Sequence, residues 1–359
     1  MAKFEYDFVV IGGGPAGRRA AIQASKLGKS VAVVDDQKLI GGVSVHTGTL
    51  PSKTIRESVM SVTGWRDRHF KARQHRNGVK AMQESINSRL STTLGDEVEV
   101  IDSQLARNNV VVLKGKAKFS GIHKLAIQQN FQGRKTIFSV TAEKFLIAVG
   151  TKPFRPKSIP FNETSVIDSD SVAANLPMPK SITVVGGGVI GLEYATIFST
   201  LEIPVTVVEA REHILEFIDR DIVANFVHQL SERGINLRLG RTIANISLNH
   251  LGFPDIVLDD GRQLQSEMLL FTAGRVGAVD DLGLEKVGIE CDSRGRLVVD
   301  KDSLQTNQPN IYAAGDIIGF PALASTSMEQ GRQAACHAFG VPIKNAGNSF
   351  PLGIYSIPE

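Results

Sequence analysis

Two short runs of apolar residues, at 8–11 and 182–185, have the length and β-branched content of strands that are buried on both faces. Each is followed by a glycine cluster, a helical segment of small residues and a second apolar run, at 31–34 and 205–208. Strand, tight turn, helix and strand in this order are typical of a βαβ unit with parallel strands. The pattern therefore predicts two such units, the first at the start of the chain and the second from near Ser181.

The pattern between these units predicts helices and then a meander. Residues 54–94 have helical periodicity and many charges, which predicts one or two long helices. Over 110–145, short alternating segments separated by turn signals predict an antiparallel β-meander. The run 145–150 reads as a buried strand that ends at Gly150, and three prolines between 153 and 160 then mark a linker.

The last third of the chain predicts a return to buried strands. Residues 255–274 predict two further strands, and 310–316 predicts a buried strand that ends in Gly-Asp. A helix is expected from about Leu323 to Phe339. The fold class is therefore α/β, with two Rossmann-like three-layer nucleotide-binding domains, the second inserted in the first, and with antiparallel β-meanders. The expected boundaries are 1–152 and 279–345 for the first domain and 153–278 for the inserted one.

Both turns carry the same glycine spacing, in the sequences Gly12-Gly13-Gly14-Pro15-Ala16-Gly17 and Gly186-Gly187-Gly188-Val189-Ile190-Gly191. An acidic residue lies 23 positions after the first glycine in both copies, at Asp35 and at Glu209. This spacing, between a strand and a helix and with an acid after the next strand, is the fingerprint of a dinucleotide site. Because both copies have the full context, the chain is predicted to bind two dinucleotides and to pass electrons between them.

The residue types suit this chemistry. Gly12 allows the tight turn, Gly14 lets the backbone approach a pyrophosphate, and Gly17 lets helix and strand pack closely. The helix N-terminus offers free N–H groups and the positive end of its dipole to the phosphates. The carboxylates of Asp35 and Glu209 are predicted to accept hydrogen bonds from both hydroxyls of an adenosine ribose.

Composition and charge exclude several other classes of protein. A net charge of +3 over 359 residues does not favour nucleic acid, and no apolar stretch reaches the roughly 18 residues that cross a bilayer. The two cysteines, Cys291 and Cys336, form no C-x-x-C or zinc spacing, and the histidines are scattered. We therefore expect no metal site, no membrane or nucleic-acid partner, and a reducing, cytoplasmic setting.

The order of these motifs resembles the flavoprotein disulfide reductase family, which includes dihydrolipoamide dehydrogenase and glutathione reductase. Within that family the chain is most similar to the soluble pyridine nucleotide transhydrogenases, over essentially its whole length. The resemblance implies that the first glycine motif binds the ADP half of FAD and that the second binds NAD(H) or NADP(H). It also implies that Asp316 holds the flavin ribityl chain and phosphate, and that the helix from Leu323 points its N-terminus at the flavin.

The resemblance identifies the residues of the site. The expected cofactor-binding positions in the two motifs are Gly12, Gly14, Pro15, Ala16, Gly17, Asp35, Gly186, Gly188, Val189, Ile190, Gly191, Glu209 and Arg211. Those outside the motifs are Gly42, Lys53, Gly150, Gly274, Arg275, Gly315, Asp316, Leu323 and Ala324. The expected catalytic residues are Lys53, Glu193, Thr49 and His46.

The segment 41–53 departs from the disulfide reductase pattern. Ser44 and Thr49 stand where disulfide reductases carry two cysteines. A hydroxyl forms neither a disulfide nor a thiolate, so the dithiol relay is predicted to be absent. Thr49 and the nearby His46 match the transhydrogenases, whereas Ser44 departs from them, because they usually keep one cysteine there.

Lys53 matches the family lysine that lies near flavin N5 and pairs with a glutamate, here Glu193. Such a pair would favour electron density on reduced flavin. Val189 stands where glutathione reductase has a gating tyrosine, so no aromatic lid is expected.

At the second motif, Glu209 favours NAD(H), whereas Arg211, assisted by His213, could pair with the 2′-phosphate of NADP(H). Arg211 could equally be a solvated loop residue.

The chain's end bears on its assembly. Family members continue with a C-terminal dimerisation domain, and residues 346–359 match its start. A homodimer is expected for the full-length family and is in doubt for a shortened chain.

The predicted function is FAD-dependent transhydrogenation between NADPH/NADP+ and NADH/NAD+ by a ping-pong mechanism, since the chain has one FAD motif and one nicotinamide motif. The alternatives are an NADH-dependent diaphorase or quinone-reducing flavoprotein, a dihydrolipoamide dehydrogenase-like protein, and an inactive flavin-binding remnant.

Overall fold

The computed structural model describes residues 4–37, 39–65, 79–131, 133–343 and 350–358. The chain divides into two compact units, each treated separately below. The first comprises Met1–His46, Gly95–Lys152 and Arg275–Leu352, and the second comprises Thr47–Leu94, Pro153–Gly274 and Gly353–Glu359. The sheet of each unit has parallel strands, and one of the two glycine turns follows a strand of each sheet, which confirms the predicted α/β class.

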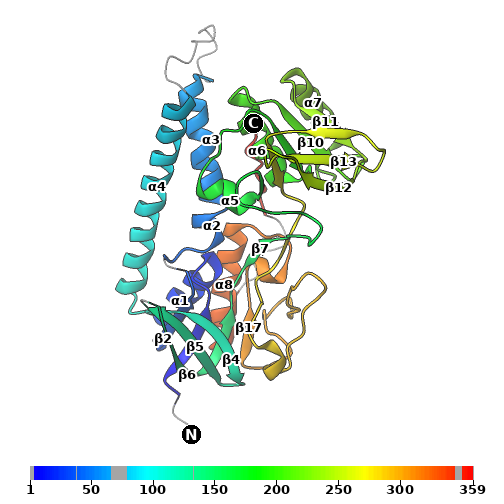
Figure 1. Ribbon diagram of the computed structural model, residues 1–359. Helices are drawn as coiled ribbons and strands as arrows, with labels where there is room; N and C mark the ends of the chain where they lie inside the picture. The colour runs from blue at the N-terminus through cyan, green and yellow to red at the C-terminus, as the bar shows by residue number, and fades with distance from the viewer. Residues whose placement is uncertain (1–3, 38, 66–78, 132, 344–349, 359) are drawn as a thin grey trace. The chain divides into compact units, whose positions relative to one another are not determined.

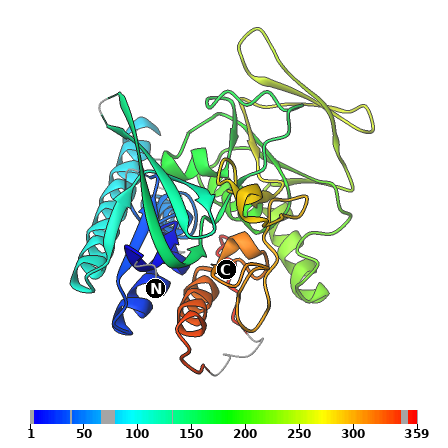
Figure 2. The same ribbon diagram turned by 90° about the horizontal axis from the view of Figure 1, so that it is seen from below.

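The sheet of the first unit has seven strands and combines a parallel part with an antiparallel part (Figures 1 and 2). The parallel part contains β1 (Tyr6–Ile11), β2 (Val31–Asp35), β3 (Val111–Lys114), β17 (Ile311–Ala313) and the end of β6 (Arg134–Ile147). The antiparallel part adds β4 (Lys116–Gly121) and β5 (Lys124–Phe131) to the beginning of β6. The long strand β6 therefore belongs to both parts.

The predicted meander needs one correction. β3 runs parallel to β2, with Ala32 opposite Val111, and so it does not belong to the antiparallel ribbon. The reason is the connection: two long helices, α3 (Thr49–Thr63) and α4 (Val79–Arg107), separate β2 from β3 and carry the chain back to the start of a parallel strand. These are the helices expected over 54–94, apart from residues 66–78, which lie outside the described ranges.

Helices α1 (Pro15–Lys26) and α8 (Ala324–Ala338) lie side by side on the first sheet (Figure 1). Their backbones meet at glycine: a Cβ on Gly331 of α8 would lie 2.0 Å from the carbonyl oxygen of Ala16 in α1. Gly315, which follows β17, also lies near α1, since a Cβ there would lie 3.1 Å from the Ala16 side chain. This contact fixes the middle of α8 against the start of α1.

The second unit has a five-stranded parallel sheet in the order β11-β10-β9-β15-β8. Its strands are β8 (Val166–Asp168), β9 (Ile182–Val185), β10 (Val205–Glu209), β11 (Asn236–Leu239) and β15 (Met268–Phe271). Helices α5 (Ser169–Ala174), α6 (Val189–Thr200) and α7 (Arg220–Glu232) belong to this unit. The small antiparallel sheet contains β12 (Ile243–Leu248), β13 (Pro254–Leu258) and β14 (Gln263–Gln265). Residues 255–274 thus contribute three strands instead of the predicted two.

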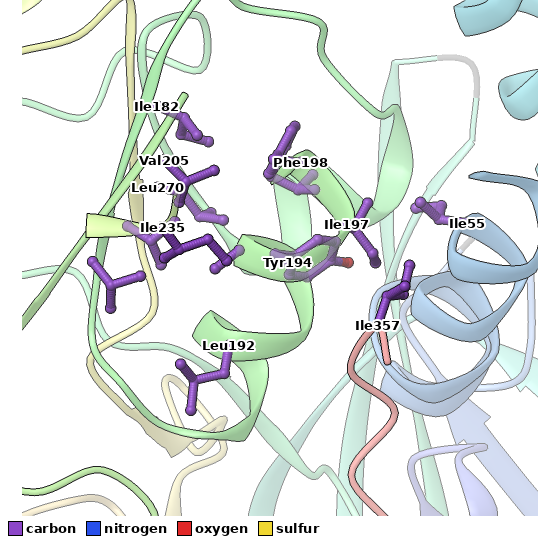
Figure 3. Packing of buried hydrophobic residues seen from close by; sticks show 14 of the residues in the cluster. Ile55, Ile182, Leu192, Tyr194, Ile197, Phe198, Val205, Ile235, Leu270 and Ile357 are labelled. Carbon is purple, nitrogen blue, oxygen red and sulfur yellow. The ribbon is translucent and has the colours of Figure 1, made fainter. Parts of the chain in front are cut away.

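Helix α6 is the centre of the second unit's core (Figure 3). Leu192 and Phe198 lie on the side of the parallel sheet, whereas Ile197 faces Ile55 of α3 and Ile357. All of these side chains are fully buried. This packing groups residues 47–94 with the second unit, whereas the sequence had placed them inside the first domain.

The remaining short elements are one helix, two strands that pair with each other and two 3-10 turns. They are α2 (Val43–His46), β7 (Thr151–Pro153), β16 (Arg275–Gly277), the 3-10 turn η1 (Leu284–Val287) and the 3-10 turn η2 (Asp316–Ile318). Among the described residues, no helix is both long enough and apolar enough to span a bilayer.

The glycine contact between α1 and α8 gives a stability prediction. Gly331→Ala should lower the free energy of unfolding by about 1–3 kcal/mol, because the new methyl group overlaps the Ala16 carbonyl. Gly95→Ala in α4 is the matched control, since a Cβ there meets nothing within 4 Å. Alanine is favoured over glycine inside a helix by about 1 kcal/mol, so this control should stabilise the protein. Thermal and denaturant unfolding of both variants measure the difference, and equal gains would contradict the close contact.

Candidate functional site: two glycine turns and a lysine–glutamate pair

The first glycine turn joins β1 to α1 in a form that only glycine permits. Gly12 has φ +102°, and a Cβ there would lie 2.4 Å from the carbonyl oxygen of Ala148. A Cβ on Gly17 would lie 1.9 Å from the carbonyl oxygen of Gly12. The helix can therefore begin directly above the end of the strand, with its first amide groups facing outward from the sheet edge.

The start of α1 offers backbone and no competing side chain. Gly14 caps the helix without a side-chain hydrogen bond, Pro15 occupies the first turn, and the first turn contains no acidic residue. Gly42 lies against this turn, because a Cβ on it would lie 2.7 Å from the Gly14 Cα. Two glycines thus face each other at a helix N-terminus, which leaves room and N–H donors for a pyrophosphate.

Asp35 ends β2 and ties this turn to the sheet. Its Oδ2 accepts a hydrogen bond from the Gly13 amide at 2.6 Å, and its Oδ1 accepts one from the Gln37 amide at 2.8 Å. The residue is 5% exposed, and burial raises the pKa of its carboxyl above the usual range despite these two bonds. A carboxylate held in this way can still accept hydrogen bonds from the hydroxyls of a ribose.

The second turn, between β9 and α6, repeats the first. Gly186 has φ +110°, and a Cβ on Gly191 would lie 2.0 Å from the Gly186 carbonyl oxygen. The Oε2 of Glu209 accepts a hydrogen bond from the Gly187 amide at 2.6 Å, the same distance as in the first copy. Gly188 begins α6 without a side-chain cap, and Val189 and Ile190 form the first turn. The two predicted motifs therefore have one geometry.

The two acids differ in their partners. The side chain of Arg211 grips Glu209 with two hydrogen bonds, Nε to Oε1 at 3.0 Å and Nη2 to Oε2 at 3.2 Å. Burial alone would raise the pKa of Glu209, but the hydrogen bonds from Arg211 and Gly187 hold it below the usual value. Arg211 is half exposed and also lies 4.0 Å from Glu216. Arg211 is thus folded back onto the acid, and His213 is exposed.

Lys53 and Glu193 form the predicted pair. The Nζ of Lys53, on α3, lies 2.8 Å from both carboxylate oxygens of Glu193, on α6. The Lys53 side chain is 28% exposed and that of Glu193 is 6% exposed. The Oγ of Ser52 lies 3.2 Å from the same ammonium group. The expectation that these two side chains meet is confirmed, and the ion pair lies within one compact unit.

Tyr355 is a member of this cluster that the sequence did not identify. Its backbone N–H donates to Oε1 of Glu193 at 3.0 Å, and its ring centroid lies 4.7 Å from the Nζ of Lys53. A hydrogen bond from a backbone amide to a side chain 162 residues away leaves no signal in a single sequence. Tyr194, beside Glu193, is also buried, and burial followed by the Glu193 charge raises the pKa of its hydroxyl, so it adds no charge here.

The segment that replaces the redox disulfide makes local contacts. The Oγ of Ser44 donates to the Gly41 carbonyl at 3.3 Å. The Nε2 of His46 donates to the carbonyls of Leu39 and Ile40, at 3.0 and 3.2 Å. His46 therefore uses this nitrogen to hold the loop before it. Thr49 is the first residue of α3 and belongs to the second unit, whereas Ser44 and His46 belong to the first.

A second group of expected residues gathers at the start of α8 in the first unit. Asp316 is mostly buried, which raises the pKa of its carboxyl, and its Oδ1 accepts from the Ser327 hydroxyl at 3.3 Å. The amide of Gly315 donates to the side chain of Gln330 at 2.9 Å. Leu323 is the N-cap residue and Ala324 the first residue of α8, whose first turn contains no acid. This N-terminus resembles those of α1 and α6 in its electrostatics.

The other expected positions lie near the two crossings between units along the chain. Gly150 and Gly274 have φ of +67° and +113°, and a Cβ on either would meet nothing within 4 Å of the described atoms. Arg275 donates from Nε to the Thr151 hydroxyl at 2.9 Å and from Nη2 to the Thr151 carbonyl at 2.9 Å. Over the described residues, no group of three histidines, cysteines or acids is placed to share a metal ion.

Comparison with known proteins identifies the family. The family described as pyridine nucleotide-disulphide oxidoreductase matches residues 6–331. A soluble pyridine nucleotide transhydrogenase of Mycobacterium bovis is 43% identical over 99% of this chain and 75% of the relative. Another, of Chromohalobacter salexigens, is 35% identical over 100% of this chain and 76% of the relative.

Solved structures give the same result. A HOCl-induced flavoprotein disulfide reductase of Escherichia coli superposes with a TM-score of 0.83 at 26% identity, over 98% of this chain and 76% of that one. LpdA of Mycobacterium tuberculosis gives a TM-score of 0.81 at 30% identity, over 94% and 73%. The family expected from the sequence is confirmed, and the protein is an oxidoreductase that belongs to the pyridine nucleotide-disulphide oxidoreductase family.

Proposed function

We propose that this chain is an FAD-dependent transhydrogenase that passes hydride between NADPH/NADP+ and NADH/NAD+ without a redox disulfide. The observation that carries the proposal is the repeated glycine turn, with one acid-to-amide hydrogen bond of 2.6 Å in each copy. Two turns of one geometry fit two dinucleotides. The names of the relatives support the choice of transhydrogenation over other reactions of the family.

The first unit has the donor set that FAD needs. The free N–H groups of α1 would bind the pyrophosphate, and Asp35 would accept from the adenosine ribose. Gly42 and its neighbour Gly14 both lack a side chain, so neither would block a pyrophosphate at this helix N-terminus. Asp316 and the start of α8 would bind the rest of the cofactor. FAD, when bound, would supply the carrier that takes hydride from one nicotinamide nucleotide and, after that product leaves, returns it to the other.

The second unit would bind both nicotinamide nucleotides in turn at one site. The N-terminus of α6 would bind their pyrophosphate, and Glu209 would bind the diol of NAD(H). Arg211 would leave Glu209 or bridge to the 2′-phosphate of NADP(H). The ion pair between them is nearly neutral, so the site repels neither nucleotide strongly. This property suits an enzyme that must accept both.

Lys53 would supply a fixed positive charge at the reacting edge of the flavin. Glu193 holds the ammonium from one side with both oxygens, so its position does not have to change during the reaction. Ser44 and Thr49 cannot form a thiolate, so electrons would not leave through a dithiol. We also place the activity in the cytoplasm, which the two free cysteines, Cys291 and Cys336, support.

An anaerobic titration tests the function directly. Purified protein should release FAD on denaturation, and both NADH and NADPH should bleach the bound flavin. Reduced protein freed of the first nucleotide should then reduce the oxidised form of the other. Bleaching by NADH alone, with quinone as the only acceptor, would identify a diaphorase instead. A folded protein without flavin would identify a remnant.

The absence of thiols at 44 and 49 gives a second prediction. Two-electron reduction should give fully bleached flavin without a long-wavelength thiolate band, because no sulfur lies at either position. Lipoamide and glutathione disulfide should not be reduced at rates above those without enzyme. The measurement is an anaerobic spectrum with each disulfide assayed in parallel, and turnover of either substrate would contradict the prediction.

Arg211 gives a third prediction. Arg211→Ala should weaken NADPH binding by roughly ten- to a hundredfold, since a charge-assisted phosphate contact contributes about 1.5–3 kcal/mol. NADH binding should change little, because Glu209 keeps its amide partner from Gly187. Dissociation constants for both nucleotides measure the effect. Arg262→Ala, an exposed arginine paired with Asp260, serves as the control for lost surface charge. Equal losses for NADH and NADPH would show that Arg211 does not recognise the phosphate.

Lys53 gives a fourth prediction. Lys53→Met should retain FAD but slow flavin reduction by roughly ten- to a thousandfold, the range for loss of one preorganised charge. The flavin reduction potential should become more negative. Stopped-flow reduction by NADH and an equilibrium potential measure both effects. The control is Lys180→Met, a lysine whose side chain is 89% exposed. A Lys53→Met protein with full flavin and an unchanged rate and potential would remove Lys53 from the mechanism.

A further inference from the structure

The segment Gly353–Pro358 is anchored to the second unit by backbone hydrogen bonds. The Ile357 amide donates to the Thr196 hydroxyl at 3.1 Å, and the Nε of Arg56 donates to the Ser356 carbonyl at 3.1 Å. Arg233 donates to the Ile357 carbonyl. The Ile357 side chain is fully buried between α3 and α6 (Figure 3). A segment held at three successive points has a fixed path over these helices.

This path brings Tyr355 onto the Lys53–Glu193 pair in two ways. Its amide donates to Oε1 of Glu193 at 3.0 Å, the same oxygen that accepts from Lys53. Its ring lies with its centroid 4.7 Å from the Lys53 ammonium, within the range of a cation–π contact. Glu193 is therefore held from two sides, and the ammonium is covered by an aromatic face.

The surroundings of the ammonium show why the ring matters. Lys53 donates to the two oxygens of Glu193 and contacts the Ser52 hydroxyl at 3.2 Å. The side chain of Lys53 still has 28% exposure, so water competes for the ammonium. An aromatic face attracts the cation, but unlike water it has no mobile dipoles that would screen the positive charge. The ring thus restricts the ammonium without neutralising it.

We propose that Tyr355 is a positioning residue for the Lys53–Glu193 pair, in which its amide fixes the carboxylate and its ring covers the ammonium. The inference rests on the proposed function, because it concerns the charge that Lys53 supplies to the flavin. It adds a residue whose side chain acts through Lys53. The hydroxyl of Tyr355 has no part in this role, so phenylalanine should replace tyrosine without loss.

The first test measures Lys53 itself and does not depend on activity. Reductive methylation of the purified protein, followed by peptide mass spectrometry, gives the labelling rate of the Lys53 amine. Tyr355→Leu should raise that rate about three- to tenfold, because the covering ring is lost. Tyr355→Phe should label like the native protein. Phe217→Leu, which replaces an aromatic residue that is 60% exposed, is the matched control and should change nothing.

The second test measures the effect on flavin reduction. Tyr355→Leu should slow stopped-flow reduction by NADH about three- to tenfold at saturation, with an unchanged nucleotide dissociation constant. Tyr355→Phe should restore the native rate. In a Lys53→Met background, Tyr355→Leu should cause no further loss, because both changes act on one charge. Thermal melting of each variant checks that the fold is intact.

The outcomes separate the two proposals. If Lys53→Met leaves flavin reduction unchanged, the proposed role of the pair fails whatever Tyr355 does to labelling. If Lys53→Met slows reduction but Tyr355→Leu labels and reacts like the native protein, the positioning role alone is overturned. It is also overturned if Tyr355→Phe behaves like Tyr355→Leu, or if Tyr355→Leu slows the Lys53→Met protein further.

Discussion

Close approach between a strand end and a helix start is the constraint on which both units depend. In each unit, the last motif glycine packs against the carbonyl of the first, at distances that no Cβ could occupy. A buried carboxylate at the end of the neighbouring strand then fixes the turn by accepting a hydrogen bond from the amide of Gly13 or Gly187, the residue after the first motif glycine. The N-terminus of the following helix, α1 or α6, consequently faces outward at the edge of the sheet. The proposed binding of a pyrophosphate in each unit follows from this one local geometry.

The two turns share one geometry but differ in the charge around their acidic residues. Among the described residues, Asp35 accepts hydrogen bonds from two backbone amides, and burial raises the pKa of its carboxyl. Glu209 has a guanidinium partner in Arg211, and its pKa is lowered. The first turn is thus suited to one constant ligand, whereas the second carries a side chain that can exchange partners. The first arrangement suits a tightly bound cofactor, and the second suits two substrates that exchange at one site.

The sequence allowed much of this to be predicted, because glycine spacing and apolar runs are local. Both turns, their acids and the Lys53–Glu193 pair were expected and are present. What could not be predicted depends on contacts between distant residues. β3 has the same pattern as a meander strand, and only its pairing with β2 reveals its direction. Residues 47–94 group with the second unit through packing against α6, and Tyr355 enters the site through its backbone.

The long strand β6 has a consequence for how the protein is made. Its end pairs with β17, so that Phe145 lies opposite Ile311, and Gly331 of α8 closes onto α1. At a synthesis rate of roughly 5–20 residues per second, Ile311 leaves the ribosome about ten to thirty seconds after Phe145. Throughout that interval the first sheet lacks a strand, and the faces of α1 and β6 that await partners are open to other chains. Folding of the first unit therefore depends on residues that are synthesised late.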